Sequence, residues 1–347
     1  MKKSCFIIAE AGVNHNGSLA NALKLVEVAA QSGADAVKFQ TFKAEKLVAV
    51  GAAKAEYQKQ QLGEDGDQFS MLKALELSDD DHEKIAAHCQ RCGIQFMSTP
   101  FDIEAADFLL KLGMKTLKIP SGELTNYPFI AELAQRNVPM ILSTGMGALA
   151  EIEEAVTVIR QSRAQAGLGE LPPNYLTILH CTSNYPAKAE DVNLLAMQTI
   201  AYRVQLPIGY SDHTLGITIA IAAVAMGAMV IEKHFTLDKA QLGPDHAASL
   251  EPQELKAMID AIRQVEAAQG DGVKAPRPSE LPVRSLVRRS LTLVKDVKAG
   301  DCVSSEDVQL LRPGTGIEPK FLASVIGQKT YAHDLPEHTT LQWSDLL

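Results

Sequence analysis

Short apolar runs alternate with amphipathic stretches from Cys5 to Gly270 of this 347-residue chain. The apolar runs, bounded by turn residues, predict eight strands at 6–9, 36–39, 94–97, 116–119, 140–142, 175–179, 207–209 and 229–231. Between them, apolar spacing predicts helices such as 19–31, 80–91, 103–112, 148–165, 193–203, 215–226 and 252–268. Eight strands alternating with helices predict an α/β protein, a (β/α)8 TIM barrel. A doubly wound open sheet is the competing fold, but no Gly-x-Gly-x-x-Gly follows the first strand.

Most of the apolar runs end in a burst of polar residues. In the most informative one, Lys118-Ile-Pro-Ser121-Gly-Glu123, a lysine, a hydroxyl and a carboxylate leave one strand end together. Comparable bursts close other runs, at 38–41, 98–102, 143–146, 180–185, 211–213 and 232–234. The carboxyl ends of barrel strands meet at one face, which carries the active site in barrel enzymes. The bursts therefore predict a single shared polar site.

Composition excludes several classes of function. The formal net charge is −9 and no basic run stands out, which argues against a nucleic-acid partner. The longest largely apolar run, 217–231, is shorter than the roughly 20 residues of a membrane helix, so no membrane partner is expected. Five scattered cysteines suit a reducing cytoplasm, and Cys89-Gln-Arg-Cys92 has no second pair with which to hold zinc. We therefore expect a cytoplasmic protein.

The composition and periodicity of the sequence change after the last predicted barrel helix. Residues 272–284 hold three prolines and little periodicity, which predicts a stiff linker. Beyond it, short β-like runs and glycine-containing turns predict a compact, mostly β domain at 285–347. The predicted organisation is thus a barrel at 1–271, a linker at 272–284 and a small domain at 285–347.

Two histidines follow neighbouring predicted strands. His213 comes after the seventh strand and His234 after the eighth, and neutral imidazoles at adjacent rim positions can share one divalent ion. The alternative is a pair of hydrogen-bonded core histidines. Glu232 shares a strand face with His234, where it either orients a metal-bound water or forms a plain ion pair.

The remaining polar residues predict an anion site beside a sugar site. Lys38 and Lys118 end the second and fourth strands, where lysine is uncommon unless it meets an anion or reaches solvent. With them, hydroxyls predict a site for phosphate and carboxylate groups, at Thr99, Ser121, Ser143 and Ser211. Planar donors and acceptors predict a polyhydroxylated ligand, at Glu10, Gln40, Glu123, Tyr185 and Asp245. The alternatives are solvated rim lysines and, for Tyr185 and Asp245, turn capping.

With these residues identified, the whole chain resembles the sialic acid synthase family, bacterial enzymes that make nine-carbon nonulosonic acids. The ordered motifs are Ile8-Ala-Glu10-Ala-Gly-Val-Asn-His-Asn-Gly17, Val37-Lys-Phe-Gln-Thr41, Ser98-Thr-Pro-Phe-Asp102, Lys118-Ile-Pro-Ser-Gly-Glu123, Ser211-Asp-His-Thr214, Glu232-Lys-His-Phe235 and Gly243-Pro-Asp-His246. The tail, notably Arg312-Pro-Gly-Thr-Gly-Ile317, is similar to the antifreeze-like (SAF) domain of that family. The resemblance therefore covers both predicted domains.

The resemblance implies a reaction of phosphoenolpyruvate with N-acetylmannosamine and water. The products would be N-acetylneuraminate (sialic acid) and phosphate, released by carbon–oxygen cleavage. A legionaminic acid synthase using 2,4-diacetamido-2,4,6-trideoxymannose is the alternative of the same class. The pseudaminic branch fits less well, because Gly12-Val-Asn-His-Asn-Gly17 and Ala55-Glu-Tyr-Gln58 are more similar to the neuraminate and legionaminate group. The heptulosonate- and octulosonate-phosphate synthases also fit less well, since they need a cationic pocket for a sugar phosphate and the rim motifs offer no arginine pair. A non-catalytic carbohydrate-binding protein is the alternative of another class.

The resemblance also implies residue roles. Mn²⁺ or Mg²⁺ would be ligated by His213 and His234. Phosphoenolpyruvate would be held by Lys38, Thr99, Lys118, Ser121, Ser143 and Ser211, and the sugar would face Glu10, Gln40, Glu123, Tyr185 and Asp245. The predicted catalytic residues are Glu123, Lys38, Lys118 and Glu10, with Glu123 as the acid–base group. Either Ser183 or Asn184 supplies a further phosphate contact, and Arg312 would reach the active site of the partner subunit in a domain-swapped homodimer.

Overall fold

The structure is a computed structural model that describes residues 4–63 and 66–347. The chain divides into two compact units, Met1–Gly270 and Asp271–Leu347. The first three residues of the predicted 1–271 domain lie outside the described residues. Within the described ranges, no helix is long and apolar enough to cross a membrane.

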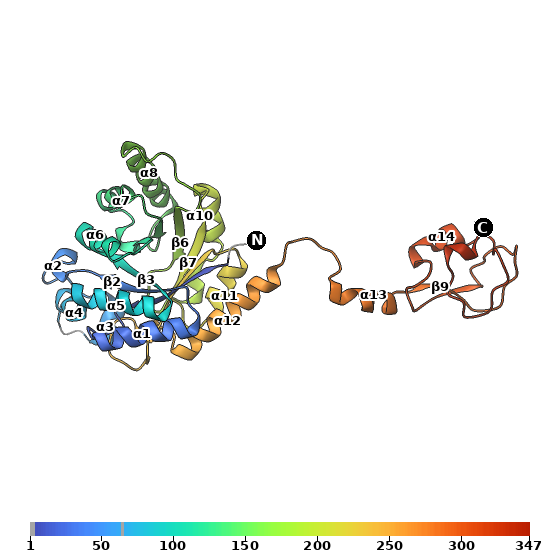
Figure 1. The fold of residues 1–347 in the computed structure, drawn as a ribbon, viewed down its shortest axis with the longest axis horizontal. Coiled ribbons are helices and arrows are strands. Elements are labelled where there is room, and N and C mark those ends of the chain that lie inside the picture. The colour runs from blue at the N-terminus through green and yellow to red at the C-terminus, as the bar shows by residue number, and fades with distance from the viewer. Residues whose placement is uncertain (1–3, 64–65) are drawn as a thin grey trace. The chain divides into compact units, whose positions relative to one another are not determined.

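The first unit is built on one parallel sheet of eight strands (Figure 1). These are β1 (Phe6–Gly12), β2 (Ala36–Thr41), β3 (Gln95–Pro100), β4 (Leu117–Ile119), β5 (Met140–Ser143), β6 (Leu176–Cys181), β7 (Ile208–Asp212) and β8 (Val230–His234). Their hydrogen-bonded order is β3-β2-β1-β8-β7-β6-β5-β4, and β3 also contacts β4, which closes the ring. The predicted (β/α)8 TIM barrel is confirmed.

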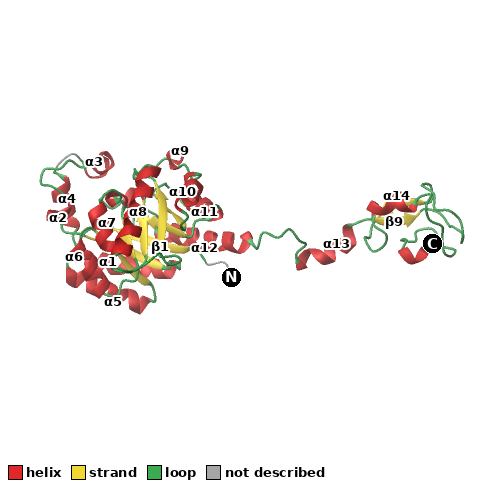
Figure 2. Ribbon diagram, turned by 90° about the horizontal axis from the view of Figure 1, so that it is seen from above, coloured by secondary structure: helices red, strands yellow, loops and turns green. Residues whose placement is uncertain are grey.

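Helices follow the strands and surround them, as Figure 2 shows in red around the yellow sheet. They are α1 (Leu19–Ser32), α2 (Ala44–Leu47), α3 (Glu56–Leu62), α4 (Gln68–Leu75), α5 (Asp79–Cys92), α6 (Ile103–Lys111), α7 (Tyr127–Ala134), α8 (Leu149–Gln165), α9 (Ala189–Val192), α10 (Ala196–Val204), α11 (Thr218–Ala225) and α12 (Pro252–Gln269). Single 3-10 turns occur at Ser121–Glu123 and His246–Ala248.

Local sequence rules explain where these helices begin and end. At the start of α5, the Ser78 hydroxyl accepts a hydrogen bond from the Asp81 amide, and the Asp81 carboxylate accepts one from the Ser78 amide. At its end, Gly93 adopts φ 71°, a left-handed conformation that costs glycine little. Its amide satisfies the carbonyls of Cys89 and Gln90, so the chain can turn directly into β3.

The barrel interior is layered, because successive strand residues point to opposite faces. A small inner core is formed by one apolar residue from each of six strands, Ile8, Ala36, Met97, Ile141, Leu179 and Val230. Two residues further along the same strands stand polar or thiol side chains that line a cavity, Glu10, Lys38, Thr99, Ser143, Cys181 and Glu232. The apolar layer is therefore the floor of the polar site.

Two features of the barrel differ from the sequence predictions. Strands such as β8 continue through their polar residues to His234, whereas the prediction ended this strand at residue 231. The ladder persists because the polar side chains alternate inward and outward like apolar ones. The segment at 43–70, where no helix was predicted, contains α2, α3 and the start of α4. These helices are too short to show clear periodicity in the sequence.

The second unit has its own core. It contains a two-stranded antiparallel sheet, β9 (Ser290–Leu293) with β10 (Val308–Leu311), and the short helices α13 (Leu281–Val287) and α14 (Leu322–Val325). Single 3-10 turns occur at Pro278–Glu280, Pro319–Phe321 and Trp343–Asp345. Buried residues from across the unit pack together, among them Leu291, Val303, Val325, Tyr331 and Leu341. Helix α13 spans the predicted boundary between linker and domain at residue 284, so that boundary stays a proposal.

Candidate active site

A cavity of about 500 Å³ lies at the carboxyl end of the barrel strands. Most of the predicted site residues line it: Glu10, Lys38, Gln40, Thr99, Lys118, Ser121, Ser143, Ser183, Tyr185, Ser211, His213 and His234. They come from all eight strands or from the segments that follow them. The closed sheet therefore brings together side chains that are far apart in the sequence, as the polar bursts predicted.

Two lysines and two carboxylates form the charged centre of the cavity. Lys38 Nζ lies 2.7 Å from Glu10 Oε2 and 3.5 Å from Glu232 Oε2. Lys118 Nζ lies 3.5 Å from Glu232 Oε1, and Lys38 also donates a hydrogen bond to Thr99. All four charged side chains are nearly fully buried, which excludes the solvated rim position considered for the lysines.

The two carboxylates respond differently to this environment. Burial works against ionisation of Glu232, but Lys118, Lys38 and the Ser211 hydroxyl outweigh it and lower the pKa of Glu232 to about 2. Burial raises the pKa of Glu10 to about 7, with Lys38 opposing the shift. Glu232, flanked by both lysines, therefore stays ionised, and Glu10 is the group that can carry a proton near neutral pH.

Four buried polar atoms of cavity residues lack hydrogen-bond partners among the described residues. Glu10 Oε2 and Glu232 Oε2 form ion pairs with Lys38. The remaining two, Ser143 Oγ and His234 Nδ1, have no lysine partner within the described ranges. An unsatisfied buried polar group costs about 1–3 kcal/mol, so such groups are uncommon in a folded protein unless a ligand or water satisfies them. Their position in the cavity that the lysines line indicates that it accommodates a polar ligand.

The two histidines meet as predicted, with ring centroids 5.6 Å apart. His213 Nδ1 lies 2.7 Å from the Thr182 carbonyl, so this nitrogen donates a proton and Nε2 keeps its lone pair. Burial lowers the pKa of His213 to about 4 and that of His234 well below its usual value. Both imidazoles are therefore neutral at physiological pH, and the Tyr185 ring packs against each of them.

This donor set fits a divalent ion held by two neutral imidazoles, with other positions left to water or substrate. The described residues include no cluster of three or more histidine, cysteine or acidic side chains around one point. The unpartnered Nδ1 of His234 is the observation that favours an ion here. It argues against the alternative of two core histidines satisfied by hydrogen bonds.

Asp245 lies beside this pair, and no lysine or arginine of the described residues forms an ion pair with it. Its Oδ2 is 3.7 Å from His234 Nδ1, and burial alone raises its pKa to about 7. The folded state therefore holds one more proton than the unfolded state between about pH 4 and pH 7, and stability falls as pH rises through that window.

Replacing Asp245 by asparagine removes the titrating group. We expect the unfolding free energy of Asp245→Asn to rise relative to that of wild type by up to about 4 kcal/mol as the pH is raised from 4 to 8. Urea unfolding of both proteins across this pH range, with chelator present, measures the difference. An unfolding free energy that depends on pH in the same way in both proteins would contradict the prediction.

A glycine shapes the wall between Ser121 and Ser183. The Gly145 amide donates a hydrogen bond to Ser121 Oγ, and a Cβ added there would lie 2.1 Å from Ser183 Oγ and 2.8 Å from Cys181 Sγ. Gly145→Ala must therefore displace the hydroxyls, and we expect kcat/KM for the anionic substrate to fall about a hundredfold. Urea unfolding of Gly145→Ala controls for folding. Wild-type kcat/KM in a folded Gly145→Ala variant would show that the hydroxyl positions do not matter.

Four predicted site residues do not line the cavity, namely Glu123, Asn184, Arg312 and Asp245, which lies behind it beside His234. The 3-10 turn Ser121–Glu123 turns Glu123 toward Asn126, whose Nδ2 donates to its carboxylate at 2.6 Å. Asn184 is exposed and its side chain accepts a hydrogen bond from the next amide, so of the two alternatives only Ser183 reaches the cavity. Arg312 is an exposed residue of the second unit, and its predicted role toward a partner subunit stays a prediction.

Other cavity residues were not predicted from the sequence. Leu47, Tyr57, Gln58 and Leu72 come from α2–α4, the segment whose helices the sequence did not predict. The Tyr57 ring packs on Tyr185 with centroids 5.1 Å apart. Glu232 was identified from its place two residues before His234 on the same strand face, and of its two predicted roles the ion pair is observed, with Lys38 and Lys118.

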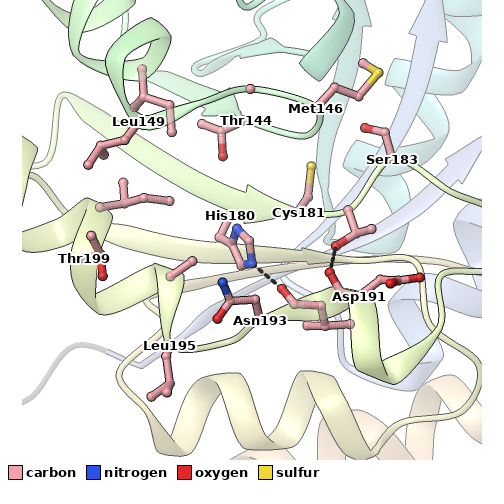
Figure 3. Close-up of a pocket in the computed structure, with 16 residues that line it drawn as sticks. Thr144, Met146, Leu149, His180, Cys181, Ser183, Asp191, Asn193, Leu195 and Thr199 are labelled. Atoms are coloured by element: carbon pink, nitrogen blue, oxygen red, sulfur yellow. Dashed lines mark hydrogen bonds between the residues drawn. The ribbon is translucent and has the colours of Figure 1, made fainter.

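A second cavity, of about 610 Å³, lies beside the first (Figure 3). The two share Met146, Cys181 and Ser183, while His180, Asn193 and Thr199 line only the second. The second is larger, but no lysine lines it, and its His180 Nε2 is 2.6 Å from the Val192 carbonyl. The charged first cavity is therefore the better candidate for chemistry.

The mouth of this α/β barrel carries buried lysines, paired carboxylates and neutral imidazoles. This combination defines an enzyme that binds an anion and transfers protons. Comparison with known proteins defines it further. Residues 25–274 match the model of the NeuB family, and residues 288–347 match the SAF domain. The chain belongs to the NeuB family. The expected class, a phosphoenolpyruvate-dependent nonulosonate synthase with a C-terminal SAF domain, is confirmed at this level.

Individual relatives are similar over nearly their whole length. The chain is 52% identical to N,N'-diacetyllegionaminic acid synthase of Legionella pneumophila, over 99% of this chain and 95% of that protein. It is 49% identical to the Campylobacter jejuni protein of the same name, over 96% and 98%. A crystal structure of N-acetylneuraminic acid (sialic acid) synthetase from Leptospira borgpetersenii with citrate superposes with a TM-score of 0.69 at 33% identity, covering 81% of this chain and 90% of that one.

Proposed function

We propose that the enzyme condenses phosphoenolpyruvate with 2,4-diacetamido-2,4,6-trideoxymannose and water to give N,N'-diacetyllegionaminic acid and phosphate. The observation that carries the choice of sugar is the similarity, at 52% and 49% identity, to two synthases of that name. N-acetylneuraminate, the first expectation from the sequence, becomes the second candidate. It keeps support from the structural similarity to a sialic acid synthetase at 33% identity.

The cavity wall supports a sugar with a deoxygenated, acetylated far end. Leu47, Val48 and Leu72, from α2, its C-terminus and α4, line the cavity together with Phe101. Apolar side chains suit the methyl groups of the deoxy carbon and of the second acetamido group, and they leave hydroxyl groups unsatisfied. N-acetylmannosamine carries hydroxyls at both positions and would fit this wall less well.

The lysines and hydroxyls suit phosphoenolpyruvate. Lys38 and Lys118 would neutralise its phosphate and carboxylate, and Ser143, whose hydroxyl lacks a partner, would donate to it. Because these groups are already fixed, they stabilise developing charge without reorganising during the reaction. Ser121, Ser183 and Ser211 would complete the anion contacts.

The proposed reaction begins with attack of the enol carbon on the sugar aldehyde. A divalent ion held by His213 and His234 would polarise the aldehyde oxygen when bound. Glu10 would donate its proton to the oxygen that becomes a hydroxyl, since its raised pKa keeps it protonated near neutral pH. Water then adds to the cationic carbon and gives its proton to the ionised Glu232. The resulting tetrahedral carbon expels phosphate by cleavage of its carbon–oxygen bond.

A panel of sugars tests the proposal. Phosphate release is measured with phosphoenolpyruvate, Mn²⁺ and either the diacetamido sugar or N-acetylmannosamine. We expect kcat/KM for the diacetamido sugar to be at least about tenfold higher than for N-acetylmannosamine. This ratio corresponds to a difference of about 1.4 kcal/mol in transition-state binding free energy. The reverse preference would select the sialic acid reaction. No phosphate with any sugar would favour the binding-protein alternative.

We also propose that two copies assemble in the cytoplasm as a domain-swapped homodimer, with Arg312 completing the active site of the partner subunit. The exposure of Arg312 on the second unit supports this. Mixing unfolded Arg312→Ala and Lys38→Met chains and refolding them tests it. Each variant alone should be inactive, whereas mixed dimers should regain one working site. No recovery in verified mixed dimers would contradict the swap.

A further inference from the structure

Asp212 and Lys233 form an ion pair that the reaction above does not use. Lys233 Nζ lies 2.8 Å from Asp212 Oδ2, and both side chains are fully buried. The two residues are direct partners in the β7–β8 ladder. A buried pair of this kind adds little net stability compared with apolar residues of the same size. Its position relative to the cavity is therefore informative.

The pair lies directly behind the two histidines. Ser211 and Glu232 line the cavity, as do His213 and His234. Since strand residues alternate between faces, Asp212 and Lys233 point away from the cavity on the same two strands. Each histidine is joined by one peptide bond to a member of the pair. The distance between the strands at this level therefore governs the distance between the two imidazoles.

The same pair also holds the chain on the far side of His213. Asp212 Oδ1 accepts hydrogen bonds from the Thr214 amide at 2.9 Å and from the Thr214 hydroxyl at 2.8 Å. Lys233 Nζ donates to the Thr214 carbonyl. His213 therefore lies between Asp212, a member of the pair, and Thr214, which both members of the pair bind. These contacts hold the chain in place where β7 ends.

We propose that the Asp212–Lys233 pair is a positioning device that sets the relative placement of the His213 and His234 imidazoles. This rests on the proposed role of those histidines as ligands of a divalent ion. The pair touches neither substrate nor ion in this scheme. Residues that orient metal ligands from behind typically change metal affinity by about 10–100-fold when they are removed.

The double variant Asp212→Asn/Lys233→Met tests the proposal. It removes both charges while asparagine keeps the acceptor for Thr214, so neither charge is left buried alone. Arg163→Met is the matched control, because Arg163 on α8 is 1% exposed, is hydrogen-bonded to Asn137 and Leu168, and does not line the cavity. Both variants are compared with wild type by thermal unfolding, by calorimetric titration of chelator-treated protein with Mn²⁺, and by kinetics.

We expect the double variant to bind Mn²⁺ about 10–100-fold more weakly and to lose kcat, while KM for phosphoenolpyruvate changes little because the lysines are untouched. The control should lose stability only.

Mn²⁺ affinity and kcat of the double variant equal to those of wild type would overturn the inference and leave the proposed function standing. If wild type itself bound no Mn²⁺, the ligand role of the histidines would fail. Crystal structures of wild type and double variant then decide: a changed imidazole separation supports the inference, and an unchanged one overturns it.

Discussion

Lys38→Met is expected to lower kcat/KM for phosphoenolpyruvate by about a thousandfold. Lys38 is the only lysine in the described residues whose ammonium group lies within 4 Å of both cavity carboxylates, Glu10 and Glu232. Removing it takes away a fixed positive charge at the anion site, where one such contact is worth about 10²–10³-fold in rate. It also leaves two buried carboxylates with one lysine, at a cost of about 3 kcal/mol in stability. Steady-state phosphate release measures the first effect and urea unfolding the second.

A surface lysine supplies the control for this change. Lys256 on α12 forms an exposed ion pair with Asp260 at 2.9 Å, so Lys256→Met removes the same charge from a solvated site. Exposed pairs contribute little, and we expect wild-type activity and stability. Lys38→Met turning over at more than about a tenth of the wild-type rate would mean that the anion binds elsewhere.

Loss of either imidazole is the second large effect. In His213→Ala and His234→Ala we expect divalent-ion binding to disappear and kcat/KM to fall about a thousandfold, because an ion acting on the aldehyde contributes several kcal/mol. Chelator treatment should inactivate wild type and Mn²⁺ should restore it, whereas neither should affect the variants. Calorimetric titration with Mn²⁺ separates loss of the ion from loss of the fold.

His88→Ala controls for the histidine change, because His88 lies on α5 and pairs with Glu27 away from the cavity. It should behave as wild type in every assay. If His213→Ala and His234→Ala kept wild-type Mn²⁺ affinity, the ion would have to bind elsewhere. The two rings would then be structural partners of Tyr185, whose ring lies 4.1 Å from that of His213.

The barrel could be predicted from the sequence because each strand carries a local signal. A β-branched apolar run such as Ile7-Ile8 followed by a helical stretch needs no tertiary information to be recognised. Helix α7 (Tyr127–Ala134) was not among the predicted helices, because its eight residues make only about two turns and begin at a tyrosine and a proline. The short helices between β2 and β3 were missed for a related reason, since helices of about two turns depend on tertiary packing.

The site could be predicted where strand geometry alone fixes side-chain direction. Lys38 and His234 lie on strands, and two-residue alternation carried them into the cavity. Glu123 lies past the strand end, in a turn whose direction is set by its own hydrogen bonds, and it was predicted less well. Tyr57 reaches the cavity only through the fold of a long connecting segment, so no local pattern pointed to it.

An apolar layer closes the barrel interior below the polar cavity, so the interior is not a continuous channel. It consists of Ile8, Ala36, Met97, Ile141, Leu179 and Val230. Both reactants must then arrive through one opening, and both products must leave by it. Phosphate and the new nine-carbon acid have to depart before the next pair of reactants can be seated. A compound lodged at that opening should accordingly slow departure as well as arrival.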